Sequence, residues 1–87
     1  MMIEKKVTIG LKTGLQARPA AVFVQQANRF VADISLVKGT TTVDAKSIMG
    51  LMSLALHQGT TVTLAATGTD AEEAVATLSE YVEGGEV

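Results

Sequence analysis

The chain of 87 residues contains no cysteine, only one proline and only 3% aromatic residues. Without cysteine it can form neither a disulfide framework, nor a redox dithiol, nor a thiolate metal site. The single histidine, His57, has no carboxylate nearby at ligand spacing, so a zinc site is not expected either. We therefore expect neither a metal nor a cofactor, and a fold that is held together by packing alone.

The sequence also lacks a long apolar run and an excess of positive charge. Its longest nearly apolar stretch, residues 48–56, is far shorter than the ~20 residues that span a bilayer. The formal net charge is −2, which provides no general attraction for a nucleic-acid backbone, and the few aromatics offer no surface for base stacking. We expect a cytoplasmic protein that binds neither nucleic acid nor membrane directly.

What is present is the balance of a compact globule, with 47% hydrophobic and 18% charged residues. A chain of this size can bury roughly 60–65% of the surface of its unfolded state, which limits it to one modest core. We expect a single domain over residues 1–87.

Alternation of apolar and polar residues predicts four short strands. Residues 3–9 form the first, in which Lys5 faces inward, a position that only an edge strand tolerates. Residues 32–44 are typical of a hairpin that turns at Gly39, and residues 61–67 form the fourth strand.

Helical spacing of apolar residues predicts three helices. The first covers residues 19–28, because proline suits a first helical turn, and the second covers residues 48–54 with Ser47 as its cap. Thr69 and Glu72 have the spacing of a capping box, which predicts the start of a last amphipathic helix.

The order βαββαβα provides enough helical surface to cover only one face of a four-stranded sheet. The fold class is therefore α+β, an open-faced two-layer sandwich. Spacing does not give the order of strands, and a ferredoxin-like sheet with an appended helix fits the same pattern.

The turn before the first helix is the first candidate site. Free N–H groups near Ala17 and Arg18 and the positive end of the helix dipole make a cradle for an anion, and Arg18 adds a forked donor. Gln16 cannot accept a phosphoryl group because its amide nitrogen is delocalised. We expect Gln16, Ala17 and Arg18 to serve recognition; the alternative is that they are ordinary solvated loop residues.

The second candidate site is Ser47, at the start of the short helix. A phosphate is best tolerated at a helix N-terminus, so phosphorylation there should change the surface without unfolding the protein. The alternative is a plain N-cap serine. The helix is too short to turn all its apolar residues to one side: we expect Leu51, Leu54 and Ala55 to face the core and a partner-binding patch to be formed by Ile48, Met49 and Met52.

His57 is the only imidazole that could replace a missing nucleophile. We place it at the far end of the short helix, just before Gly59, which we expect to close that helix. A cation at that position complements the helix C-terminus, so we interpret His57 as structural.

Two long motifs stand out: Thr13-Gly14-Leu15-Gln16-Ala17-Arg18-Pro19-Ala20-Ala21 and Ala45-Lys46-Ser47-Ile48-Met49-Gly50-Leu51-Met52-Ser53-Leu54. Both resemble the HPr family, the histidine-containing phosphocarriers of the sugar phosphotransferase system. The similarity extends over essentially the whole chain. It implies a four-stranded antiparallel sheet in the order 1-4-2-3 with three helices on one face.

The resemblance also implies a function. Gln16 matches the carrier histidine, and Ser47 matches the regulatory serine that HPr kinase/phosphorylase modifies. The serine-phosphorylated form is implied to bind a LacI-type repressor, catabolite control protein A, as its corepressor. Arg18 would pair with an acid on the repressor, and the patch of Ile48, Met49 and Met52 would pack against the repressor and the kinase.

These implications describe a protein that is not an enzyme and acts in catabolite repression. A phosphocarrier that uses His57 and a purely structural scaffold are the alternatives. The first strand could also exchange between subunits through the loop of residues 10–14, so we expect a monomer that can form an edge-strand-swapped homodimer.

Overall fold

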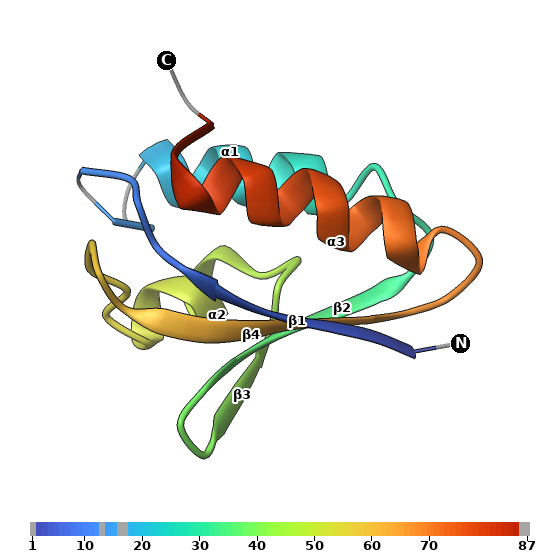
Figure 1. Cartoon of the computed structure of the whole chain (residues 1–87), viewed down its shortest axis with the longest axis horizontal. Helices are drawn as coiled ribbons and strands as arrows, with labels where there is room; N and C mark the ends of the chain where they lie inside the picture. The colour runs from blue at the N-terminus through green and yellow to red at the C-terminus, as the bar shows by residue number, and fades with distance from the viewer. Residues whose placement is uncertain (1, 13, 16–17, 86–87) are drawn as a thin grey trace.

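The computed structural model describes residues 2–12, 14–15 and 18–85. The order of elements confirms the prediction of βαββαβα, with one further π-helical turn that continues the last helix (Figure 1). In chain order the elements are β1 (Met2–Thr8), α1 (Arg18–Ala27), β2 (Asp33–Lys38), β3 (Thr41–Asp44), α2 (Ile48–Ser53), β4 (Thr61–Thr67), α3 (Ala71–Glu80) and η1 (Tyr81–Gly85).

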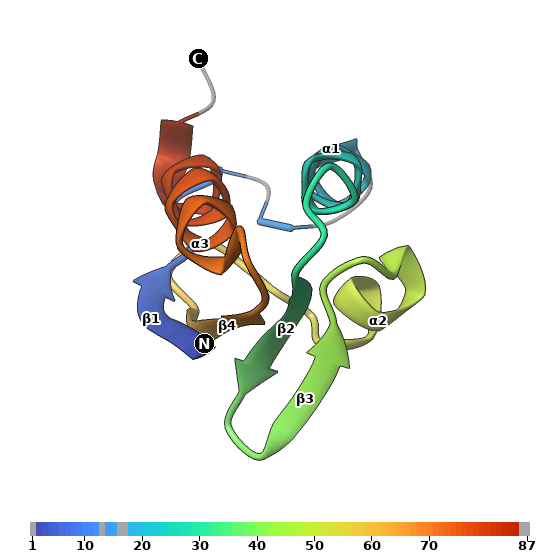
Figure 2. The ribbon, with the colours of Figure 1, turned by 90° about the vertical axis from the view of Figure 1, so that its right-hand side faces the viewer.

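The four strands form one antiparallel sheet in the order β1-β4-β2-β3, with β1 and β3 at its edges. This is the order that the resemblance implied and that spacing left open. The helices lie on one side of the sheet, so the other face meets solvent (Figures 1 and 2). The α+β open-faced sandwich is therefore confirmed.

The register places one row of side chains across the inner face of the sheet. Lys5 of β1 is opposite Leu64, which is opposite Leu36, which is opposite Val43 of the other edge. At its edge position Lys5 stays exposed, and its Nζ donates to Ser79 Oγ of α3 at 3.4 Å. This confirms that a lysine faces inward on an edge strand.

The core lies between this face and the helices, as the amphipathic patterns of α1 and α3 predict. Phe23 of α1 and Leu78 of α3 are fully buried against Leu36 and Leu64 of the sheet. Burying a side chain of this size stabilises the fold by roughly 1.5–3 kcal/mol.

The end of α2 differs from the sequence prediction. The helix ends at Ser53, and Gly59 lies in a loop instead of closing it. Ala55 is exposed, although it was expected in the core, and Leu56 is fully buried in its place. The reason is the left-handed conformation of Ala55, with φ of 51°, which turns the chain so that the next side chain points inward.

The predicted capping box at the start of α3 is also wrong. The N-cap is Asp70, and its side chain makes no capping bond. Its two carboxylate oxygens instead accept hydrogen bonds from the backbone N–H groups of Val31 (2.8 Å) and Ala32 (2.9 Å). The bond from Val31 is the main reason that the pKa of Asp70 lies below its ordinary value. Asp70 therefore fastens the α1–β2 connection to the start of α3.

Candidate functional site

The turn before α1 is anchored on both sides. Leu15 is fully buried, and its N–H donates to Leu56 O at 2.9 Å, while the Gly14 N–H donates to Leu11 O at 2.9 Å. Arg18, the first residue of α1, is exposed, and its recognition role stays a prediction. The other two expected recognition residues, Gln16 and Ala17, lie outside the described residues.

His57 lies in the loop after α2, so its predicted place at the helix C-terminus is wrong. The cation at that end is Lys38 of β2, whose Nζ donates to Leu54 O at 2.8 Å and reaches Ala55 O at 3.5 Å. A cation there complements the partial negative charge of the last carbonyl groups. The sequence carries no local signal for this contact, because Lys38 comes from the neighbouring hairpin.

Ser47 caps α2 as predicted. Its backbone is extended, with φ of −119° and ψ of 117°, and its Oγ accepts a hydrogen bond from the Gly50 N–H at 3.1 Å. The preceding residue, Lys46, is hydrogen-bonded through both its backbone and its side chain. Its N–H donates to Asp44 Oδ1 at 2.9 Å, and its Nζ donates to Phe30 O at 2.9 Å. The half-buried hydroxyl of Ser47 thus sits at the positive end of a fixed helix.

The apolar residues of α2 and of the turn after it divide between core and surface as expected, apart from Ala55. Leu51 is fully buried, whereas Ile48 is 41%, Met49 79% and Met52 49% exposed. Gly50 permits close packing on β3, because a Cβ at this position would lie 3.2 Å from Val43 Cβ. The surface made of Ile48, Met49 and Met52, called the α2 patch below, therefore adjoins Ser47 on a helix that packs against β3.

Among residues 2–12, 14–15 and 18–85, no three His, Cys, Asp or Glu side chains are grouped so that they could hold a metal ion. In the same part of the chain, no helix combines the length and the apolar character that crossing a membrane requires.

Comparison with known proteins places this site in context. The family model described as the PTS HPr component phosphorylation site matches residues 3–84. The HPr-like protein Crh of Bacillus subtilis is 60% identical over 82 residues, which covers 94% of this chain and 96% of that protein.

Solved structures agree with this match. A crystal structure of the phosphocarrier protein HPr from Bacillus anthracis superposes with a TM-score of 0.92 at 58% identity, covering 93% of this chain and 96% of the other. A crystal structure of Bacillus subtilis Crh, described as a swapped dimer, gives a TM-score of 0.78 at 56% identity and 98% coverage of both chains. On sequence and fold alike, the chain belongs to the HPr family.

Proposed function

We propose that this chain is a regulatory, non-enzymatic member of the HPr family that acts as a single cytoplasmic domain in carbon catabolite repression. HPr kinase/phosphorylase phosphorylates Ser47, and the phosphorylated protein binds catabolite control protein A as its corepressor. The observation that carries this proposal is the position of Ser47, at the cap of a helix that exposes the α2 patch beside it.

A phosphate on Ser47 is compatible with the fold. Ser47 Oγ already accepts from the Gly50 N–H, and the phosphate oxygens can accept the same kind of hydrogen bond. The helix dipole stabilises an anion at this end by roughly 0.3–1 kcal/mol. Phosphorylation adds a charge of about −1.5 to −2, which a basic side chain of the partner can bind.

The α2 patch and Arg18 supply the rest of the proposed interface. Methionine side chains adapt to different apolar partners, which suits a surface that meets both a kinase and a repressor. Arg18, exposed at the start of α1, can form a forked pair with an acid on the repressor. Gln16, at the position of the carrier histidine, removes phosphoryl transfer and leaves recognition.

The first test is phosphorylation by HPr kinase/phosphorylase with ATP, followed by intact mass. We expect the wild-type protein to gain one phosphoryl group and Ser47→Ala to gain none. Ser53→Ala is the matched control, because Ser53 lies at the other end of the same helix and its Oγ donates to Gly50 O at 2.7 Å. Phosphorylation of Ser47→Ala, or no phosphorylation of the wild type, contradicts the proposal.

The competing function is a phosphocarrier that uses His57. It is favoured by one observation: the loop that carries His57 is bonded to the turn before α1 through Leu15 and Leu56. Incubation with enzyme I and phosphoenolpyruvate decides between the two. Acid-labile phosphate that disappears in His57→Gln supports the carrier, and its absence supports the regulatory protein. A scaffold without either role would leave Ser47 unmodified by the kinase.

For assembly, we propose a monomer in exchange with a dimer that swaps β1. The support is the edge position of β1, which pairs only with β4, together with the swapped dimer described for Bacillus subtilis Crh. Light scattering at increasing concentration should reveal a dimer that forms slowly, since β1 must leave its own sheet first. A monomer at every concentration contradicts this part of the proposal.

A further inference from the structure

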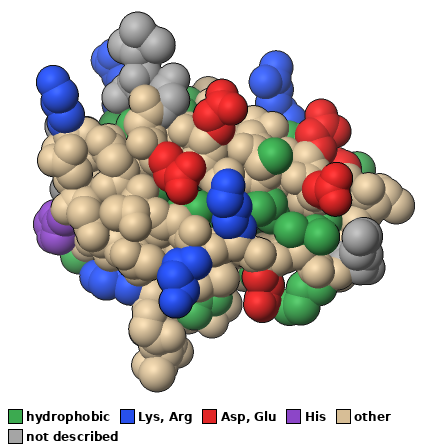
Figure 3. All heavy atoms as spheres, viewed as in Figure 1, with side chains coloured by type: hydrophobic (Ala, Val, Ile, Leu, Met, Phe, Trp, Pro, Cys, Tyr) green, Lys and Arg blue, Asp and Glu red, His purple; other side chains and the backbone are tan. Residues whose placement is uncertain are grey.

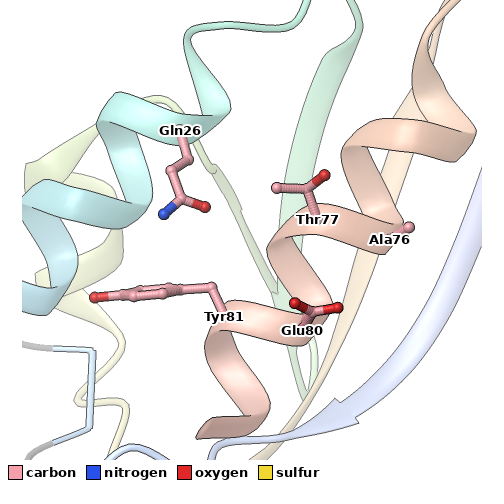
Figure 4. Close-up of a pocket in the computed structure, with 5 residues that line it drawn as sticks. All are labelled: Gln26, Ala76, Thr77, Glu80 and Tyr81. Carbon is pink, nitrogen blue, oxygen red and sulfur yellow. The ribbon is translucent and has the colours of Figure 1, made fainter. Parts of the chain in front are cut away.

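A polar hollow lies between α1 and the end of α3, and it shares no residue with Ser47 or the α2 patch. It is open to solvent, with a volume of about 280 Å³. Gln26 reaches into it from α1, and the Tyr81 ring extends from the end of α3 toward α1 and forms one side (Figure 4). The lining residues are Gln26, Ala76, Thr77, Glu80 and Tyr81. We call this hollow the α1–α3 groove.

The groove presents acceptors and an aromatic face, and none of its five lining residues is basic. Glu80 supplies an exposed carboxylate, Gln26 an amide oxygen and Thr77 a hydroxyl. We propose that the α1–α3 groove binds the guanidinium group of an arginine side chain on a partner protein.

The chemistry selects a guanidinium over other groups. Its planar fork donates two hydrogen bonds to one carboxylate, its face stacks on an aromatic ring, and its remaining N–H groups reach neighbouring acceptors. An ammonium is a point charge that cannot stack in this way. An anion is repelled by the carboxylate of Glu80, which lines the groove. On the face on which α3 lies, acidic and basic side chains are interspersed (Figure 3), so the selectivity comes from the groove itself and not from the charge of the whole face.

The aromatic wall of the groove contacts the first turn of α1. Tyr81 Oη donates to Pro19 O at 3.5 Å, and Pro19 is in the first turn of α1, directly after Arg18. This long contact restrains the hydroxyl end of the half-buried ring, which reduces the conformational freedom that is lost when a side chain stacks on it. The proposal does not depend on phosphorylation of Ser47.

The probe is N-acetyl-L-arginine amide, titrated into ¹⁵N-labelled protein and followed by NMR. We expect saturable shifts of the Gln26 side-chain amide and of the backbone amides of Thr77 and Tyr81, with a dissociation constant in the millimolar range. The matched neutral compound is N-acetyl-L-citrulline amide, which keeps the shape of arginine and replaces the charged group by a urea. Citrulline should produce no saturable shift. Equal binding of the two compounds overturns the proposal, as does the absence of saturable shifts with arginine.

Variants locate the site. Glu80→Gln keeps the size of the side chain and should weaken binding of the arginine compound by roughly threefold, because it removes the paired charge. Glu72→Gln is the control on the same helix, outside the groove, and should bind like the wild type. Both residues are exposed, so the variants are expected to fold, and their ¹⁵N spectra verify it. Unchanged affinity in Glu80→Gln overturns the assignment of the site to this groove.

Discussion

Gly14→Ala should destabilise the protein strongly, because this glycine lies where the turn before α1 touches the loop after α2. A Cβ at position 14 would overlap Leu56 O, a backbone atom that cannot rotate away. The chain must shift, and the hydrogen bond from the Leu15 N–H to Leu56 O is lost. Gly14 also has φ of +71°, which an alanine adopts only with strain.

The magnitude follows from these two terms. The left-handed conformation costs an alanine about 1–2 kcal/mol. Leaving the donor of the fully buried Leu15 without its partner costs about 1–3 kcal/mol more. Gly39→Ala isolates the first term, because Gly39 has a similar φ of +62° and nothing lies within 4 Å of the position of its Cβ. We therefore expect a loss of about 2–5 kcal/mol for Gly14→Ala and about 1–2 kcal/mol for Gly39→Ala.

Urea unfolding and thermal melts of the two variants measure this difference. Each kcal/mol should lower the Tm of a domain of this size by roughly 4–8 °C, so the two variants are easily told apart. Equal destabilisation of the two variants would refute the reasoning, because the overlap with Leu56 and the lost hydrogen bond would then contribute nothing to the change in the free energy of unfolding. Greater destabilisation of Gly39→Ala would refute it as well.

Three further changes test individual contacts of the fold. Lys38→Met removes the cation that donates to Leu54 O and should lower the free energy of unfolding by about 1.5 kcal/mol in urea melts. Lys38→Arg keeps a cation there and should retain most of that stability, so equal losses in the two variants contradict the proposed contribution of the Lys38 charge. The pKa of Asp70 is lowered, chiefly by the hydrogen bond from Val31, so the Asp70 carboxylate stabilises the fold fully above its ordinary pKa of 3.8 and loses this effect as the pH falls through the folded pKa. The difference in unfolding free energy between the wild type and Asp70→Asn should therefore shrink over that pH range, and a difference that does not depend on pH contradicts this role. Ser47→Ala should cost about 1 kcal/mol in thermal melts through the lost cap, and an unchanged Tm speaks against the cap.

Local patterns predict the parts of the fold that depend on neighbours in the chain. The cap of Ser47 reaches only three residues ahead, to Gly50, and it appears as expected. The inward face of α1 follows from helical periodicity alone, and Phe23 is buried as that periodicity requires. Strand order was left open by spacing, since it depends on pairing between distant segments, and it came from the resemblance.

The features that sequence reasoning missed are set by contacts between distant segments. Asp70 satisfies two N–H groups that lie 38 and 39 residues away, so it does not take part in the expected capping box. Lys38 occupies the helix end that was assigned to His57, and it does so across 16 residues. Ala55 was expected in the core because helical spacing was extended to it, beyond the end of the helix. Nothing local indicates its left-handed turn, since the residue is not a glycine.

The central claim is that the charge on Ser47 controls binding to the repressor. Titration of catabolite control protein A with phosphorylated and unphosphorylated protein tests it most directly. We predict that the phosphorylated form binds about 100-fold more tightly, a differential free energy of about 2.7 kcal/mol, which one or two charge-assisted hydrogen bonds can supply. Equal affinity of the two forms would contradict the account.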